Sequence, residues 1–128
     1  DEWLAGRRCA TWPGGGLEFG EGPKDWARRE AVEELGQPIE LGDLVHATGS
    51  CVRSAWRPTD QVLCHYYLAR LQDASAFRVA QKPFDFQGSS NQSFRWETAS
   101  DFDPESLSFA TDREAWKALT AHWGRHAG

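Results

Sequence analysis

The stretch from Gly14 to Gly36, GGGLEFGEGPKDWARREAVEELG, most constrains what this chain can fold into. Pro23 suits the first position of a helix, where no backbone N–H is needed, and Gly22 can stand at the N-cap. Gly36 lies where a left-handed residue would end that helix. The sequence therefore predicts a helix from about Pro23 to Leu35, entered through a glycine-rich turn.

Three glutamates, Glu30, Glu33 and Glu34, fall within little more than one turn of this predicted helix. At about 100° per residue they share one face, and the apolar side chains of the helix are expected to pack on the other. The expected packing face consists of Ala27, Ala31, Val32 and Leu35.

The repulsion within this acidic face requires a positive partner. Like charges one turn apart destabilise a helix by roughly 0.2–0.5 kcal/mol per pair. Arg29 can reach Glu33 at i+4, but one guanidinium cannot neutralise three acids. A hard divalent cation held by oxygen ligands is therefore the natural partner. The competing interpretation is that the glutamates simply form a solvated helix face.

The complete spacing of the stretch favours the cation site. Its fixed positions are Gly15, Glu21, Arg29, Glu30, Glu33, Glu34 and Gly36. With these residues at these spacings the chain resembles the Nudix hydrolases, whose signature they reproduce position for position. Two further positions fit loosely, because the family prefers a bulky aliphatic residue where this chain has Ala31 and Gln37.

The resemblance implies a fold, an activity and a set of site residues. The fold is an α/β/α sandwich with a mixed sheet, formed by residues 1–128 as a single domain. The activity is Mg²⁺- or Mn²⁺-dependent hydrolysis of a nucleoside diphosphate linked to another moiety, which makes the protein a hydrolase of phosphorus-containing anhydrides. The implied metal ligands are the Gly14 carbonyl, Glu30, Glu33 and Glu34. The implied catalytic residues are Glu33, Glu34, Arg29 and Glu21. In this set Arg29 orients the metal ligands, and Glu21 supports the loop and the helix.

The general base is where this sequence departs from its relatives. Many Nudix enzymes place a glutamate about six residues before a late tryptophan, here Trp96. That position is Ser90, in a loop over residues 88–92 that contains no carboxylate. Either Asp85 serves as the base, or Glu33 does while the other two helix glutamates hold the metals. The second alternative is favoured, because a carboxylate within the metal cluster already lies beside an acidified water.

Substrate selection lies outside the signature. Trp56, Phe19 and Arg57 are the candidate substrate contacts, although aromatic side chains are more often part of a core. The proline that marks ADP-ribose hydrolases and the tyrosine of dinucleoside polyphosphate hydrolases are not in place, since Pro58 and Tyr66 lie too far along the chain. By elimination we expect a nucleoside triphosphate pyrophosphohydrolase. A nucleotide-sugar or dinucleoside-polyphosphate enzyme and a non-catalytic nucleotide-sensing module remain open alternatives.

The net charge, the cysteines and the lack of long apolar runs argue against several kinds of binding partner and site. A net charge of −5 argues against binding to nucleic-acid polymers or anionic membranes, which rely on basic surface. Three cysteines without C-x-x-C spacing predict isolated, buried or half-buried thiols rather than a disulfide framework or zinc site. No apolar run approaches a membrane span and no signal peptide is recognisable, so the cytoplasm is the default location. A homodimer is left open.

The remaining elements are predicted from local patterns. The chain starts at Asp1 and contains no methionine, so we expect that the N-terminal strand or strands of the family fold are missing from it. The predictions are a loop over Asp1–Arg8, a short strand over Cys9–Trp12, strands over Ile39–Leu41 and Leu44–Cys51 broken by Gly42-Asp43, a covered central strand over Val62–Leu71, a strand over Phe94–Glu97, and a helix over Arg113–His122 capped by Thr111 or Asp112.

Overall fold

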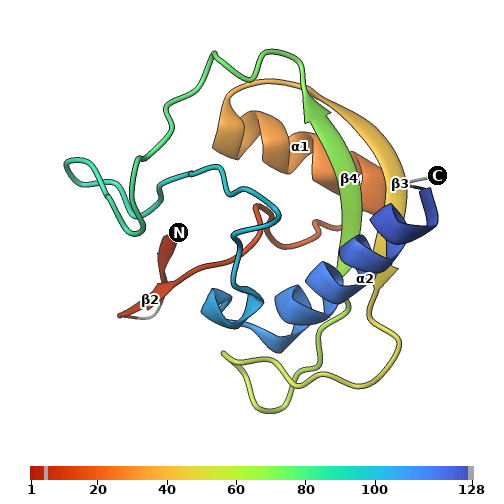
Figure 1. Cartoon of the computed structure of the whole chain (residues 1–128). Helices are drawn as coiled ribbons and strands as arrows, with labels where there is room; N and C mark the ends of the chain where they lie inside the picture. Colours follow the sequence, from red (N-terminus) through yellow and green to blue (C-terminus); the bar gives the residue numbers. More distant parts are fainter. Residues whose placement is uncertain (5, 127–128) are drawn as a thin grey trace.

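The structure is a computed structural model that describes residues 1–4 and 6–126 (Figure 1). In chain order its elements are β1 (Glu2–Leu4), β2 (Arg7–Cys9), α1 (Pro23–Leu35), β3 (Ile39–Ala47), β4 (His65–Leu71), the 3₁₀ helix η1 (Pro104–Ser106) and α2 (Ala110–His126). Strand β1 pairs antiparallel with β2, and β3 pairs antiparallel with β4. The predicted α/β class is confirmed, but the described strands form two antiparallel pairs instead of one mixed sheet.

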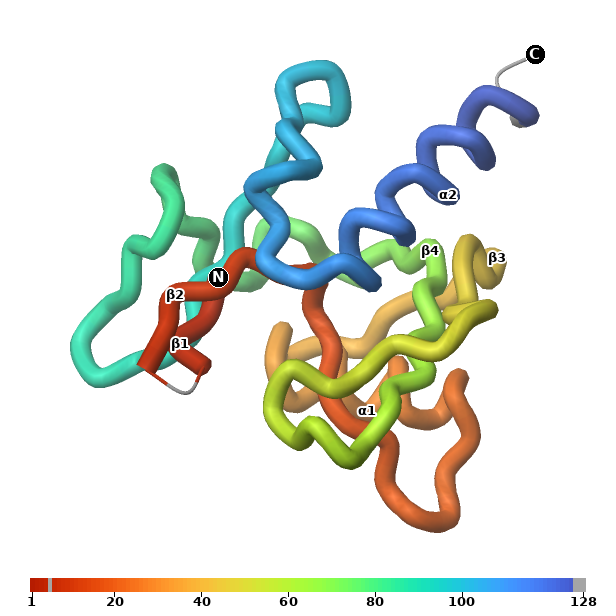
Figure 2. The backbone as a smooth tube through the Cα atoms, turned by 90° about the horizontal axis from the view of Figure 1, so that it is seen from below, coloured from red at the N-terminus to blue at the C-terminus, as the bar shows by residue number. Residues whose placement is uncertain are grey.

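The two long helices lie on opposite sides of the β3–β4 pair, as the view in Figure 2 shows. Both helices contact β3. The buried apolar residues are small for the most part, and aromatic side chains pack against one another nearby. The ring centroid of Trp116 in α2 lies 6.1 Å from that of Trp12, on which it stacks, and 4.7 Å from that of Phe102. The buried apolar residues are Cys9, Ala10, Ala31, Ala80, Leu107 and Ala115.

Helix α1 begins and ends at the predicted residues. Gly22 is the N-cap, and its backbone N–H donates to Asp25 Oδ2 at 3.0 Å. Gly36 takes a left-handed φ of 71° at the C-terminus, a conformation that glycine adopts without a steric penalty. Ala31 is buried as expected, but Val32 is 54% exposed, which corrects its assignment to the packing face. Val32 lies roughly 140° around the helix from Ala27 and therefore faces solvent.

The predicted break in the third strand is wrong, because β3 runs through Gly42 and Asp43. The pairing with β4 shifts register between Leu41 and Leu44, which is how a strand absorbs extra residues without ending. A Cβ on Gly42 would lie 3.3 Å from Leu68 Cβ, so the glycine allows β4 to approach. Strand β4 is shorter than predicted and half-buried over most of its length, with β3 as its partner in the described sheet.

Other local predictions also need correction. Residues 2–4, 7 and 8, expected in a loop, belong to the β1–β2 hairpin. Of the strand predicted over Cys9–Trp12, only Cys9 lies in a strand, as the last residue of β2. Residues 94–97 form no strand, although the Phe94 carbonyl accepts a hydrogen bond from Ala80 N at 2.7 Å. Helix α2 begins at Ala110, ahead of its expected caps. The cysteines are free thiols, as predicted, but Cys51 is exposed.

Candidate active site

Hydrogen bonds connect the glycine-rich turn to the first half of α1. Trp26 Nε1 donates to the Gly15 carbonyl at 2.8 Å, and Arg29 Nη2 donates to the Gly16 carbonyl at 3.0 Å. The Glu30 carboxylate lies directly against the turn, so that a Cβ on Gly15 would fall 2.6 Å from its carboxyl carbon. This close approach explains why a glycine stands at this position.

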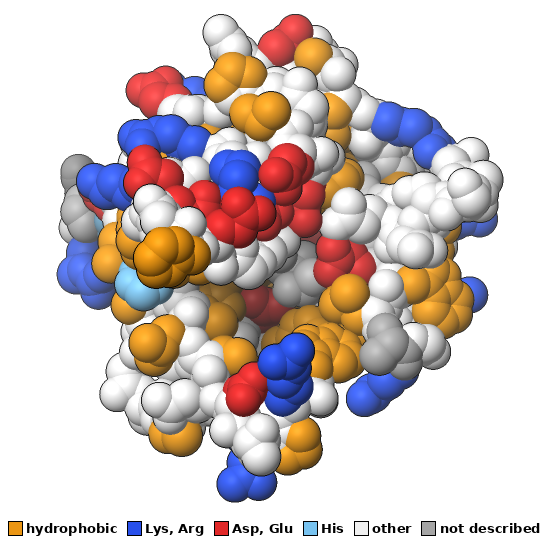
Figure 3. Space-filling view, turned by 180° about the vertical axis from the view of Figure 1, so that it is seen from behind, with side chains coloured by type: hydrophobic (Ala, Val, Ile, Leu, Met, Phe, Trp, Pro, Cys, Tyr) orange, Lys and Arg blue, Asp and Glu red, His pale blue; other side chains and the backbone are white. Residues whose placement is uncertain are grey.

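Arg29 links the acidic side chains of the site. Its Nη2 and Nε atoms donate to the two oxygens of Glu21 at 2.7 and 2.9 Å, a bidentate pair. Its Nη1 donates to Glu33 Oε2 at 3.0 Å and Glu30 Oε1 at 3.2 Å. The hydrogen bonds that Arg29 donates to Glu21 and, to a smaller extent, to Glu33 raise the pKa of Arg29, and the hydrogen bond from Arg29 lowers the pKa of Glu21. Figure 3 shows acidic side chains gathered around a basic one on this face, beside a hollow.

Glu21 also closes the turn that precedes the helix. Its Oε1 atom accepts from the Glu18 backbone N–H at 2.8 Å while it binds Arg29. Side-chain exposure of Glu21 is 14%, so this pair is partly shielded from solvent. Glu21 therefore connects the turn to the helix, which is the arrangement that its predicted supporting role needs.

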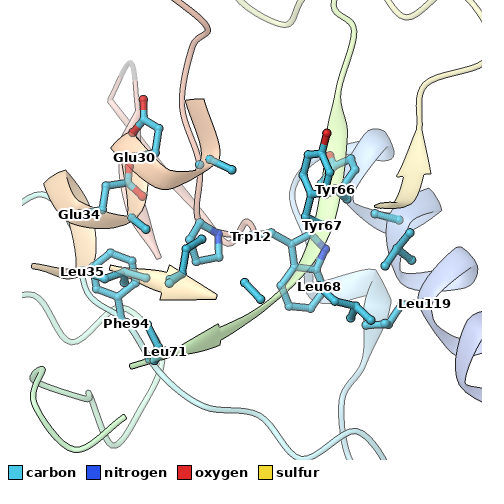
Figure 4. Close-up of a pocket in the computed structure, with 18 of the residues that line it drawn as sticks. Trp12, Glu30, Glu34, Leu35, Tyr66, Tyr67, Leu68, Leu71, Phe94 and Leu119 are labelled. Atoms are coloured by element: carbon cyan, nitrogen blue, oxygen red, sulfur yellow. The ribbon is translucent and has the colours of Figure 1, made fainter. Parts of the chain in front are cut away.

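The three helix glutamates do not point the same way. The side chain of Glu30 is 13% exposed and that of Glu33 is 54% exposed. Glu30 and Glu34 line a partly open cavity of about 460 Å³, whose walls also include residues of β3, β4 and α2 (Figure 4). Glu33 instead lies at the surface, where its Oε2 atom accepts a hydrogen bond from Arg29 Nη1 at 3.0 Å.

Burial makes the charge on Glu34 costly. It raises the pKa of this carboxyl to about 7, and the nearby carboxylates of Glu30 and Glu2 act in the same direction. Hydrogen bonds from the Gln92 amide and the Gly14 backbone partly offset the increase. A buried carboxylate with acidic neighbours is stabilised by any positive charge that enters beside it.

A second cavity of about 650 Å³ adjoins the first and shares Trp12, Pro13, Gly14 and Trp26 with it. Trp56, a predicted substrate contact, lines this second cavity. The other two predicted contacts lie outside both cavities. Phe19 is fully exposed on the turn before α1, and the exposed Arg57 lies 3.7 Å from Asp60.

Comparison with models of known protein families gives a match for this chain. The model of the NUDIX domain matches residues 2–119, which is most of the chain. This chain belongs to the Nudix family. Nudix proteins hydrolyse nucleoside diphosphates linked to another moiety and generally use divalent metal ions such as Mg²⁺. Searches of curated proteins and of solved structures gave no match. In the described range, no helix combines the length and apolar character needed to cross a membrane.

The donor set of this Nudix site suits a hard cation. Glu30, Glu34 and Gly14 line the same cavity, and Mg²⁺ and Mn²⁺ prefer oxygen ligands of the kind that carboxylates and backbone carbonyls supply. Within residues 1–4 and 6–126, no three acidic, histidine or cysteine side chains already converge closely enough to hold an ion.

Two residues that sequence reasoning missed lie at this Nudix site. Gln92 Nε2 donates to Glu34 Oε1 at 3.2 Å and also to Glu2 Oε1. Gln92 belongs to the loop over residues 88–92, where the family's glutamate was expected. Its position shortly before Trp96 was the sequence feature that could have marked it as a site residue. No local pattern could indicate Glu2, because it joins the site through contacts across 90 residues of sequence.

Proposed function

We propose that this Nudix protein is a Mg²⁺- or Mn²⁺-dependent pyrophosphohydrolase that acts on nucleoside triphosphates. The observation that carries the proposal is the location of Glu30 and Glu34 on one cavity wall, beside the glycine turn and the Arg29 network. Every acidic position of the family signature is filled, which favours catalysis over nucleotide sensing. The expected products are a nucleoside monophosphate and pyrophosphate.

Each residue of the site has its own proposed role in this reaction. Glu30, Glu34 and the Gly14 carbonyl would hold the cation, with Glu33 close by on the same helix. When bound, the cation shields the phosphate oxygens and lowers the pKa of the attacking water. Arg29 orients Glu30 and Glu33 by charge-assisted hydrogen bonds at 3.2 and 3.0 Å.

The second cavity is the proposed place for the nucleoside. Its volume of about 650 Å³ falls in the usual range for small-molecule sites, and it reaches Gly14 and Gly15 next to the glutamates. Trp56 is 49% exposed, and its indole ring is proposed to stack on the base. Phe19 and Arg57 are candidates for contact with parts of the substrate that extend beyond the cavity.

A substrate screen tests this function. Nucleoside triphosphates, nucleotide sugars, dinucleoside polyphosphates and nucleoside monophosphates are each incubated with the protein and Mg²⁺ or Mn²⁺, and nucleotide, phosphate and pyrophosphate products are quantified. We expect monophosphate and pyrophosphate from a triphosphate, and no reaction after chelation. Preferential cleavage of another anhydride would select that class instead. Release of a bare nucleoside from a monophosphate, or a rate that survives chelation, would refute the proposal.

A further inference from the structure

One amide group joins two carboxylates from distant parts of the chain. Gln92 Nε2 donates to Glu34 on α1 at 3.2 Å and to Glu2 on β1. We infer that Glu2 is a further carboxylate of the metal centre and that Gln92 is a positioning residue, which holds Glu2 and Glu34 on either side of a divalent cation. This inference rests on the metal dependence proposed above.

Backbone pairing fixes the position of Glu2. The first residues of the chain run antiparallel to residues 91–93, with Trp3 N donating to the Asn91 carbonyl at 2.9 Å and Ser93 N donating to the Asp1 carbonyl at 3.0 Å. Glu2 and Gln92 are directly opposite in this short ladder. On its other edge Glu2 pairs with Cys9 of β2, which is buried. The Glu2 side chain is thus held over Gln92 by the fold.

The location of Glu2 connects the acidic helix with the proposed nucleoside cavity. Glu2 lines the second cavity together with Gly14 and Gly15, whereas Glu34 lines the first cavity together with Gly14. The two carboxylates therefore approach the same backbone segment. Glu2 and Glu34 would hold a cation together with the Gly14 carbonyl, the backbone ligand proposed above.

Electrostatics favour a cation at this point. Two half-buried carboxylates that share one donor repel each other, and an amide N–H supplies only a partial positive charge. A divalent ion supplies a full compensating charge, and its affinity rises with the number of carboxylates around it.

Direct Mn²⁺ binding tests the inference without reliance on turnover. Electron paramagnetic resonance titration measures the dissociation constant of the wild-type protein, Glu2→Gln and the control Glu105→Gln. Glu105 is an exposed residue of η1 that lines neither cavity, so its substitution removes the same charge elsewhere. We expect Glu2→Gln to weaken Mn²⁺ binding by about tenfold or more and the control to leave it near the wild-type value.

A gain-of-charge variant provides the second test. Gln92→Glu places a carboxylate where the amide now separates Glu2 from Glu34, so repulsion should lower the melting temperature in the presence of a chelator. If a cation binds between these groups, Mn²⁺ should raise the melting temperature of this variant more than that of the wild type. A structural role for Gln92 would lower the melting temperature equally with and without Mn²⁺.

The outcomes separate this inference from the proposed function. If Glu2→Gln binds Mn²⁺ as tightly as the wild type, or Gln92→Glu gains no extra stabilisation from Mn²⁺, Glu2 is outside the metal centre and only the further inference fails. If the wild-type protein itself binds no Mn²⁺ and hydrolyses no nucleotide, both fail together.

Discussion

At the scale of single residues, the site depends on how closely Glu30 can approach the glycine turn. A Cβ at position 15 would lie 2.6 Å from the Glu30 carboxyl carbon and 2.8 Å from Oε2, distances at which one group must move. Gly15→Ala should therefore displace Glu30 and lower kcat/KM on the order of 10²-fold, the effect expected for misplacing a catalytic group by about 1 Å. Steady-state kinetics measure this loss.

Gly16→Ala is the matched control for that substitution. A Cβ at position 16 would meet no atom within 4 Å, and the Gly16 carbonyl that Arg29 binds is unchanged by the substitution. We expect this variant to keep kcat/KM within about twofold of wild type, as surface substitutions usually do. Equal losses in the two variants would mean that the turn needs flexibility rather than room for Glu30.

Glu34→Gln separates the charge of Glu34 from its shape. Because this carboxyl is half-buried near Glu30 and Glu2, loss of its charge removes repulsion and should leave the melting temperature unchanged or raised. Activity should fall by about 10² or more, because the variant lacks one of the carboxylates proposed to bind the metal. Thermal denaturation and metal-dependent kinetics on the same preparation check both effects. A variant that keeps most of its metal-dependent rate would exclude this helix face as the site.

At the scale of secondary-structure elements, Asp112 joins α2 to two other parts of the fold. Its carboxylate accepts hydrogen bonds from the Thr11 hydroxyl and, at 2.7 Å, from the Tyr66 hydroxyl of β4. Its backbone carbonyl accepts from Trp12 Nε1 at 3.2 Å. The sequence pattern that predicted an N-cap identified a residue with the right chemistry but not its partners, which come from distant segments.

The buried Asp112 carboxyl should give stability a defined pH dependence. Burial raises its pKa above the ordinary value, despite the hydrogen bonds from Thr11 and Tyr66 that favour the charged form. The folded protein then keeps a proton that the unfolded chain has released, so this group's contribution to the free energy of unfolding falls as pH rises from about 4 towards the folded pKa. Above the folded pKa the contribution is constant.

Urea unfolding of wild type and Asp112→Asn across that pH range measures this contribution. Asparagine does not titrate, so the stability of the wild type relative to the variant should decrease as pH rises and then level off. The matched control is Asp101→Asn, which removes an exposed carboxyl of the same type. A difference between wild type and Asp112→Asn that is independent of pH would show that Asp112 has an ordinary pKa.

At the scale of the whole molecule, the features that could be predicted from the sequence are those set by residues close together along the chain. The bounds of α1 were predicted correctly, since its proline, glycine caps and glutamate spacing are all local. The β1–β2 hairpin was missed because each of its strands has only three residues, which is too few to show an alternating pattern. The Glu2–Gln92 contact was missed because it depends on pairing between the two halves of the chain. The predicted strand over 94–97 failed for the same reason, since strand formation depends on which neighbours are available to pair.

The identity of the general base also depends on the arrangement of the whole molecule. Asp85 is half-buried, lines neither cavity and accepts a hydrogen bond from Gln87 Nε2 at 3.4 Å. Glu33 lies on the helix that carries the proposed metal ligands, and Arg29 holds it at 3.0 Å. Because the Arg29 guanidinium also contacts Glu30 at 3.2 Å, Glu33 stays within the cluster while its outer side faces solvent. These positions favour Glu33 as the base.

Paired kinetics on Glu33→Gln and Asp85→Asn decide between the two carboxylates. If Glu33 accepts the proton of the attacking water, Glu33→Gln should lower kcat by about 10² or more, within the range for loss of a general base, while Asp85→Asn changes it only modestly. Mn²⁺ affinity measured on both variants distinguishes loss of the base from loss of a ligand, since Glu30 and Glu34 remain in each. A large loss of kcat with near-normal metal affinity in Asp85→Asn, together with a modest loss in Glu33→Gln, would assign the base to Asp85. That result would require the segment around residue 85 to move towards α1 when substrate binds.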